Sequence, residues 1–294
     1  MHNFRHLVLP TMPSVHALKY VRANGVDFAY HEAGSGPLVL CLHGWASSLR
    51  MWQRISKQLA SHYRVISLDL PGFGDSSLPG PGFDFAAENY AAVVSAFLAQ
   101  AASAPAVTLG HSMGGLIAIH LARRHPDQVN GLVLSNPVIT GNIGPGLSAF
   151  LRSRMGQRIL QLSQHSRLLA PLGQRAFLAD PRFFRGPALQ RTITDLARSA
   201  PEALSGCLRA ILESDVSGCL AELAMPALII TGAHDRTIPV ADARLAAQRI
   251  PGAHLAIVPR ASHLPMDEQP VLFDRLVEGY LTRYVPRPKT SAAA

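Results

Sequence analysis

The chain has 294 residues, 48% of them hydrophobic, and a formal net charge of +8. This apolar content supports one large core, so the length fits a catalytic domain with an inserted subdomain as well as two ordinary domains. Nearly all of the positive charge comes from scattered arginines, not from a dense basic run with stacking aromatic residues. We therefore expect no nucleic-acid partner.

Cysteine usage and hydropathy narrow the class of protein further. Cys41, Cys207 and Cys219 lack the spacing of metal ligands, so we expect no metal site. No segment has the roughly 18 uninterrupted apolar residues of a membrane-spanning helix, and the apolar stretch near Met1 is too short for a secretory signal. We therefore expect a soluble, cytoplasmic protein.

The first predicted elements form an antiparallel hairpin around Asn24-Gly25, a pair that accepts the positive φ angles of a tight turn. Short apolar runs and longer helical periods then alternate along the chain. The runs lie at 38–42, 65–68, 107–109 and 132–134, and the helical periods at 49–60, 86–101 and 113–124. Continuous apolar runs are typical of strands buried on both faces, so the pattern predicts an α/β fold with a doubly wound, mostly parallel sheet.

This alternation stops after Pro137. Residues 140–216 have a helical, arginine-rich pattern that prolines interrupt. Apolar runs return at 227–231 and 255–258, and a last helical period covers 271–284. We therefore expect a catalytic domain built from residues 17–139 and 217–285, a helical cap at 140–216, and loose termini at 1–16 and 286–294.

The strongest chemical signal is Gly110-His111-Ser112-Met113-Gly114, which follows an apolar strand and precedes a helical period. A serine hydroxyl is a weak nucleophile and must be held exposed near a base, which a sharp strand-to-helix turn does where glycines remove clashing side chains. Two glycines around a serine are more often an ordinary turn, but the strand-to-helix placement favours a nucleophile at Ser112. With this motif the sequence resembles the α/β-hydrolase family.

In that family an acid and a histidine follow the serine in this order, each after a later strand. The resemblance therefore implies Asp235, which follows the run at 227–231, as the acid and His263, which follows the run at 255–258, as the base. The chain has 13 histidines, and only His263 follows the last predicted strand. Some relatives carry the acid after an earlier strand, but Asn136 stands there and an amide supplies no carboxylate.

The resemblance also implies an oxyanion hole. Its two donors are the backbone N–H of Met113 and that of Trp45 in the loop His43-Gly44-Trp45. For the Trp45 indole two interpretations stay open, since the ring can line the pocket or merely pack in the core. We further expect His43, Gly44 and His111 to contribute to substrate binding.

These residues predict a serine esterase that cleaves a carboxylic ester, or a related acyl bond, of a small and largely apolar substrate through an acyl-enzyme. No cofactor is required. Two alternatives stay open: a hydrolase of carbon–carbon bonds in ring-cleavage products, and a ligand receptor without turnover on the same fold. Haloperoxidase activity and acyl transfer rank behind them.

The predicted cap holds ten arginines against five acidic residues. An apolar stripe at helical spacing is flanked there by Arg152, Arg154 and Arg158. The stripe consists of Leu147, Phe150, Leu151, Met155, Ile159 and Leu162. We favour the interpretation that the stripe packs onto the catalytic domain and the arginines are solvated. The alternative is that this basic face selects anionic substrates or contacts a membrane.

Overall fold

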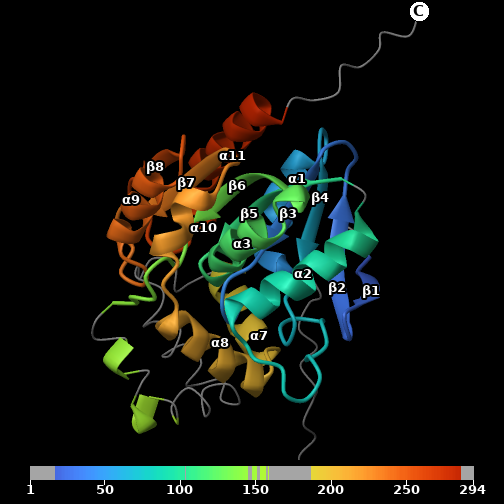
Figure 1. Ribbon diagram of the computed structural model, residues 1–294, viewed down its shortest axis with the longest axis vertical. Helices are drawn as coiled ribbons and strands as arrows, with labels where there is room; N and C mark the ends of the chain where they lie inside the picture. Colours follow the sequence, from blue (N-terminus) through green and yellow to red (C-terminus); the bar gives the residue numbers. More distant parts are fainter. Residues whose placement is uncertain are drawn as a thin grey trace, which may run out of the picture.

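An eight-stranded sheet forms the centre of the computed structural model (Figure 1), which describes residues 17–102, 104–144, 148–150, 153–156, 158 and 187–285. The strand order is β1-β2-β4-β3-β5-β6-β7-β8. The strands are β1 (Lys19–Ala23), β2 (Val26–Ala33), β3 (Leu38–Leu42), β4 (Arg64–Leu68), β5 (Ala106–His111), β6 (Val129–Ser135), β7 (Ala227–Gly232) and β8 (His254–Val258). β2 runs antiparallel to β1 and β4, and the remaining neighbours are parallel. The predicted doubly wound, mostly parallel sheet is confirmed.

The predicted hairpin joins β1 to β2. Asn24 and Gly25 both have positive φ angles, 46° and 78°, as a two-residue turn between right-twisted strands requires. Only residues that tolerate the left-handed region fit such a turn, and this explains why the pair was informative in the sequence.

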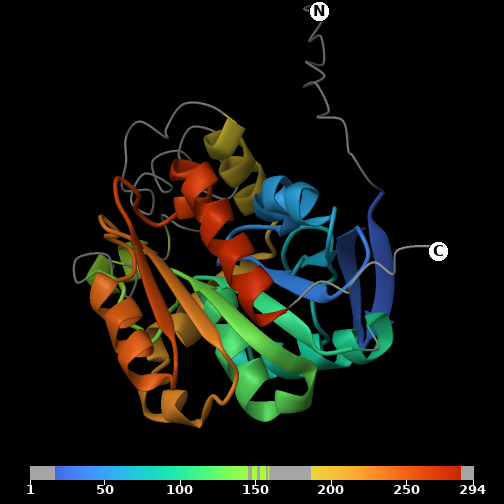
Figure 2. The same ribbon diagram turned by 90° about the horizontal axis from the view of Figure 1, so that it is seen from above.

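Helices cover both faces of the sheet (Figure 2). In the described part of the chain they are α1 (Gln53–Leu59), α2 (Ala87–Ala101), α3 (Met113–Arg124), α7 (Pro187–Ala197), α8 (Pro201–Glu213), α9 (Val240–Arg249), α10 (Pro265–Glu268) and α11 (Pro270–Tyr284), with 3₁₀ turns η1 (Leu49–Trp52), η2 (Pro126–Gln128) and η4 (Ser217–Glu222). Helices α2, α3, α8 and α9 share one buried apolar cluster, and α1 and α11 share the other. Along β3, Leu40 and Leu42 enter the first cluster while Val39 and Cys41 enter the second, because successive strand side chains point to opposite faces.

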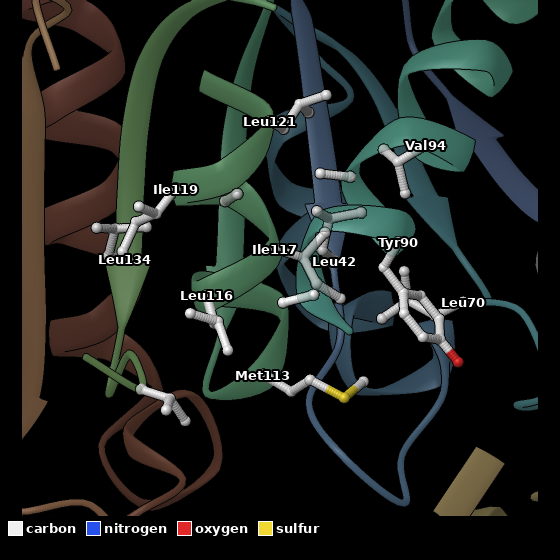
Figure 3. Close-up of a cluster of buried hydrophobic side chains, with 14 of the residues drawn as sticks. Leu42, Leu70, Tyr90, Val94, Met113, Leu116, Ile117, Ile119, Leu121 and Leu134 are labelled. Atoms are coloured by element: carbon white, nitrogen blue, oxygen red, sulfur yellow. The ribbon is translucent and has the colours of Figure 1, made fainter. Parts of the chain in front are cut away.

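The first cluster fixes helix α3 against the sheet. Leu116 and Ile117 of α3 lie in it beside Leu42 of β3 and Leu134 of β6 (Figure 3), and all four are fully buried. Truncating one such leucine to alanine costs about 2–5 kcal/mol of folding free energy. The start of α3, which follows Ser112, is therefore held rigidly at the carboxyl ends of the parallel strands.

Three elements differ from the sequence-based expectation. The helical period at 49–60 divides into the 3₁₀ turn η1 and helix α1. Helix α9, rich in alanine and arginine, and the single turn α10 were not predicted, because neither carries a clear apolar periodicity. Within the described ranges no helix combines the length and apolar character needed to span a membrane.

Candidate active site

Ser112 lies at the sharp turn between β5 and α3. Its backbone φ is 51° and its ψ is −113°, a strained conformation for a residue other than glycine, and the side chain is 6% exposed. The Ser112 N–H donates to the backbone oxygen of Ser135 at the end of β6, 3.0 Å away. The turn predicted from the sequence is therefore present and tied to the neighbouring strand.

Glycines make this turn sterically possible. A Cβ atom at Gly110 would lie 2.4 Å from the backbone oxygen of Gly114, and one at Gly114 would lie 2.4 Å from that of Leu42. Both contacts involve backbone atoms, which cannot swing aside as a flexible side chain can. The strand, the turn and the helix therefore approach one another only with glycine at these two positions.

His263 and Asp235 meet as the order in the sequence implies. The Nδ1–H of His263 donates to Oδ2 of Asp235 at 2.8 Å, and both side chains are buried. This hydrogen bond fixes the neutral tautomer whose Nε2 lone pair can accept a proton. Ser112 and His263 line the same pocket, so the three predicted residues are brought together.

The Asp235 carboxylate is fully hydrogen-bonded. Besides His263, Oδ2 accepts from Nδ2 of Asn136 at 2.6 Å, and Oδ1 accepts from the N–H groups of Thr237 at 2.8 Å and Ile238 at 3.0 Å. Burial alone would raise the pKa of Asp235, but the His263 ring and these donors hold it below its ordinary value. Asp235 therefore stays ionised, as an orienting acid must.

The sequence indicated only that Asn136 supplies no carboxylate, and its role as a hydrogen-bond donor to the acid was not predicted. Its φ of 48° and its three donor contacts, to Thr231, Asp235 and the backbone of Ser262, place its amide under the acid loop. Its position at the carboxyl end of β6 was the available signal.

The loop before His263 is anchored by Glu268. The Ser262 hydroxyl donates to Glu268 at 2.9 Å and accepts from the N–H of His263 at 2.6 Å, and the Ser262 N–H also donates to Glu268. Helix α10 therefore holds the backbone of the candidate base in place.

His111 also supports the base from behind. Its Nε2–H donates to the backbone oxygen of His263 at 2.8 Å, and the two ring centroids are 4.7 Å apart. Burial, followed by the neighbouring His263, lowers the pKa of His111 to about 3, so the ring is neutral. Because His111 also lines the pocket, the prediction of substrate contact stays a prediction beside this positioning contact.

His43 and Gly44 are not among the residues that line the pocket, so their role in substrate binding stays a prediction. His43 is fully buried, accepts from the Leu70 N–H at 2.9 Å and donates to the Gly44 oxygen at 2.7 Å, so both ring nitrogens are used away from the pocket. A Cβ atom at Gly44 would lie 2.7 Å from Nδ1 of His111. Both residues support the pocket wall instead of lining it, because the ring of His43 turns toward the loop after β4.

The two expected oxyanion donors follow two neighbouring strands of the sheet, β5 and β3. Met113 is the first residue of α3, where a backbone N–H has no partner within the helix. Trp45 follows β3, lines the pocket and donates from its indole to the backbone oxygen of Leu204 on α8 at 2.9 Å. Trp45 therefore contributes to the pocket lining, and its indole N–H is bound to a helix of the predicted cap.

The pocket at Ser112 is largely apolar. It is lined by Trp45, Ala46, Ser47, Met51, His111, Ser112, Val138, Ile143, Arg191, Thr192, Leu208, Ile211, Thr237, Ile238, His263 and Leu264. Helices α7 and α8 supply Arg191, Thr192, Leu208 and Ile211, so the segment between β6 and β7 forms one wall.

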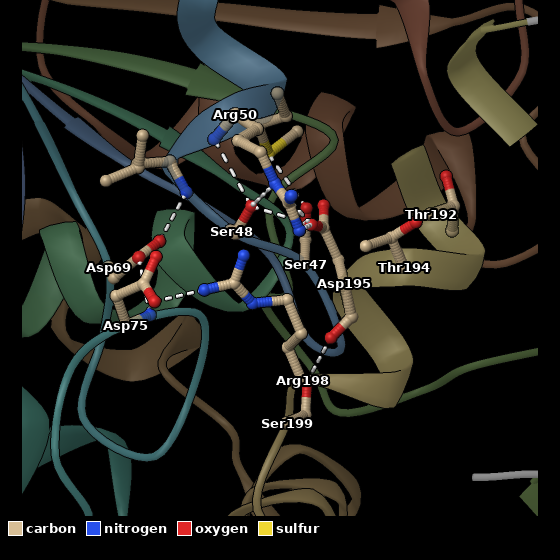
Figure 4. Close-up of polar contacts among 12 residues, drawn as sticks. Ser47, Ser48, Arg50, Asp69, Asp75, Thr192, Thr194, Asp195, Arg198 and Ser199 are labelled. Carbon is tan, nitrogen blue, oxygen red and sulfur yellow. Dashed lines mark hydrogen bonds and ion pairs between the residues drawn. The ribbon is translucent and has the colours of Figure 1, made fainter. Parts of the chain in front are cut away.

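Ion pairs fix α7 over this pocket. The buried Asp195 accepts from the Ser48 hydroxyl at 2.8 Å and from Arg50, and Arg198 pairs with Asp75 (Figure 4). Arg191 binds both carboxylate oxygens of Asp267 on α10, at 3.1 and 2.6 Å.

Most of the apolar stripe predicted for the cap lies outside the described residues. These undescribed members are Leu147, Leu151, Ile159 and Leu162, and the flanking Arg152 is undescribed as well. Two further members of the stripe, Phe150 and Met155, are exposed.

Comparisons with known proteins point to one family. Residues 37–270 match the family described as alpha/beta hydrolase fold. The chain is 32% identical over 252 residues to a pimeloyl-[acyl-carrier protein] methyl ester esterase of Pectobacterium carotovorum subsp. carotovorum (strain PC1), covering 83% of this chain and 94% of that relative. An esterase of the same name from Aeromonas hydrophila subsp. hydrophila is 30% identical, over 84% of this chain and 96% of its own length. The crystal structure of a hydrolase from Pseudomonas aeruginosa PA01 superposes with a TM-score of 0.79 at 26% identity, covering 91% of this chain and 99% of that one.

Proposed function

This chain belongs to the α/β hydrolase fold family and is a carboxylic ester hydrolase, and from that premise we propose that Ser112, Asp235 and His263 are its catalytic triad. The observation that carries the proposal is the 2.8 Å hydrogen bond from His263 Nδ1 to Asp235 Oδ2 beside the pocket that Ser112 lines. Sharp strand-to-helix turns with this hydrogen-bonded pair nearby are the arrangement that nucleophilic serine catalysis needs.

The cycle follows from this geometry. His263 Nε2 takes the proton of Ser112 while the Ser112 oxygen attacks the ester carbonyl, and the same proton then passes to the leaving alcohol. Asp235 stabilises the imidazolium that forms in between. Water, activated by His263, attacks the acyl-enzyme and releases the acid, and Ser112 regains its proton.

The N–H groups of Met113 and Trp45 form the proposed oxyanion hole. Negative charge develops on the carbonyl oxygen during attack, and donors fixed in advance stabilise that charge more than they stabilise the neutral ester. Met113 supplies its donor at the N-terminus of α3, where the helix dipole adds a favourable field.

For the substrate we propose a methyl ester of an apolar acyl chain. The two esterase relatives are named for a methyl ester of an acyl group on a carrier protein. The apolar walls supplied by Val138, Ile143, Leu208 and Ile238 suit an acyl chain. We further propose that residues 140–216 act as the cap over this pocket. Cytoplasmic location and the absence of nucleic-acid and membrane partners stay predictions from the sequence.

The esterase names of the relatives favour ester cleavage over the carbon–carbon alternative. That alternative is tested by offering a ring-cleavage product beside the esters. The receptor alternative predicts binding of an ester with, at most, a single slow turnover, and so steady release of methanol over many cycles would contradict it.

The test measures hydrolysis of methyl esters of graded acyl length by the wild-type protein and the Ser112→Ala variant. We expect Ser112→Ala to lower kcat by up to about a million-fold while the fold stays intact. A fluorophosphonate should label Ser112, and the exposed Ser61 serves as the matched control, since Ser61→Ala should keep both labelling and activity. Full activity in Ser112→Ala would refute the assignment.

A further inference from the structure

Arg191 brings a fixed charge to an otherwise uncharged pocket. Of the described residues lining the pocket, the others are apolar, hydroxyl-bearing or histidine. The Arg191 side chain is 19% exposed, and Arg191 lines the same pocket as His111 and Ser112. A bound acyl chain that fills the pocket therefore has a guanidinium beside it.

The guanidinium is only partly used by its protein partners. A guanidinium carries five N–H groups, and the pair with Asp267 uses one on each terminal nitrogen. The Nε–H is buried and makes no hydrogen bond to any described residue. Because Nε is buried, a ligand oxygen would instead take one of the terminal N–H groups that Asp267 leaves unused, on a side chain that is 19% exposed and lines the pocket.

The surrounding charges decide what kind of oxygen fits. Asp267 neutralises Arg191, while Asp195, further along α7, pairs with Arg50. These four groups sum to zero, and a carboxylate entering the apolar pocket would lose its hydration without meeting an uncompensated positive charge. An uncharged carbonyl oxygen has a much smaller desolvation cost and still accepts a strong hydrogen bond from a guanidinium.

We propose that Arg191 is a specificity-determining residue that donates a hydrogen bond to a second, uncharged carbonyl oxygen of the substrate, on the acyl chain beyond the ester that Ser112 attacks. This inference rests on the proposed esterase function and adds the substrate class: acyl methyl esters with a distal amide, ketone or ester group. The competing role is purely structural, in which Arg191 only anchors α7 to α10 through Asp267.

The experiment compares three methyl esters of equal chain length. One is a simple alkanoate, one carries a terminal primary amide, and one carries a terminal carboxylate. For the wild-type protein we expect the highest kcat/KM with the amide. Arg191→Met should lower kcat/KM for the amide by about ten- to a hundred-fold more than for the alkanoate, the size expected for one hydrogen bond to a charged group.

Two further variants separate recognition from anchoring. Arg191→Lys keeps a cation opposite Asp267 but loses the guanidinium fork, so the melting temperature should be kept while the preference for the amide falls. Asp267→Asn removes the compensating charge but keeps Arg191, so the preference should move toward the carboxylate ester.

The outcomes are distinct. An equal loss of kcat/KM for all three esters in Arg191→Met would show an anchoring role and overturn the proposal. A wild-type protein that does not prefer the amide would also overturn it. The shift in melting temperature of the Ser112→Ala variant on binding each of the three intact esters gives the same comparison without turnover. Failure of every ester to be hydrolysed, with the amide still bound best through Arg191, would overturn the esterase assignment and keep the Arg191 site.

Discussion

Asn136 lies at the end of β6, where some relatives carry the acid. Here it instead donates a hydrogen bond to Asp235, the candidate acid that follows β7. Its amide and the imidazole of His263 donate to the same oxygen of Asp235. Oδ2 is thus held from two sides, and the orientation of the imidazole depends on both donors. An aspartate at 136 would place a second negative charge against Asp235 and could not donate this hydrogen bond when ionised.

We predict that Asn136→Ala lowers kcat of the esterase reaction. A hydrogen bond to a charged group contributes about 1.5–3 kcal/mol, which corresponds to a loss of about ten- to a hundred-fold. Removing this donor also raises the pKa of Asp235, so the decline in activity with falling pH should begin at a higher pH. The check is a pH profile of kcat/KM for the variant.

The matched control is Asn130→Ala, an exposed asparagine on the same strand. It should leave both kcat and the pH profile unchanged. A lower kcat in Asn136→Ala with an unmoved acid limb would mean that the amide only supports the loop backbone of Ser262.

At the scale of elements, the strand, turn and helix that present Ser112 depend on backbone contacts closer than a Cβ atom allows. Gly110→Ala would place its Cβ 2.4 Å from the Gly114 oxygen, so β5 and α3 must separate. We predict a loss of about 1–3 kcal/mol or more in the free energy of unfolding, together with a marked loss of activity. Urea denaturation and ester hydrolysis measure the two effects.

Gly279 provides the opposite case in helix α11. It is exposed, and a Cβ there meets no atom within 4 Å. Gly279→Ala should therefore stabilise the protein by about 0.5–1 kcal/mol, since alanine loses less backbone entropy in a helix. Equal effects of the two substitutions would show that the turn at Ser112 can relax.

Local patterns explain which elements the sequence predicted well. Buried strands such as β3 and β5 are continuous apolar runs, and the turn at Ser112 needs glycines at fixed positions, so both are readable within a few residues. Helix α9 has no such pattern and is held by tertiary packing through Ala243 and Ala246. The chain order of Ser112, Asp235 and His263 was then enough to predict that these three residues form the candidate triad.

Contacts between distant segments explain what the sequence could not predict. Arg191 meets Asp267, 76 residues away, and was only one of many arginines in a helical pattern. His43 was predicted to contribute to substrate binding, yet its ring accepts a hydrogen bond from the N–H of Leu70, 27 residues later. Pairings of this kind depend on three-dimensional packing and leave no local pattern.

At the scale of the whole molecule, buried carboxylates link stability to pH. Burial raises the pKa of Asp69 to about 6, although the N–H groups of Leu49 and Asp75 oppose this, and burial also raises the pKa of Asp195. An acid whose pKa is raised by folding stabilises the fold below its unfolded pKa of about 3.9, and this contribution is lost as the pH rises through the folded value.

We therefore predict that Asp69→Asn flattens the dependence of unfolding free energy on pH between about 4 and 6. Urea denaturation at several pH values in this window measures it, with the wild-type protein as reference. Asp27→Asn, at an exposed aspartate, is the control, and its unfolding free energy should depend on pH as that of the wild type does. A parallel curve for Asp69→Asn would show that Asp69 titrates in the folded protein as it does in the unfolded chain.

The placement of α7 over the pocket depends on a buried ion pair. The Asp195 side chain is 0% exposed and its partner Arg50 is 28% exposed, whereas the surface pair Arg22–Asp27 is 71% and 54% exposed. Removing one partner of a buried pair leaves an uncompensated charge and costs about 3–5 kcal/mol, against about 0–1 kcal/mol for an exposed pair.

Since Arg50 is partly exposed, we predict for Arg50→Met a loss near or just below about 3 kcal/mol, and for the matched Arg22→Met almost none. Urea denaturation gives both values, and KM should rise in Arg50→Met alone, because the neighbouring Ser47 and Met51 line the pocket. Equal stability of the two variants would mean that apolar packing, not this ion pair, holds α7 against the catalytic domain.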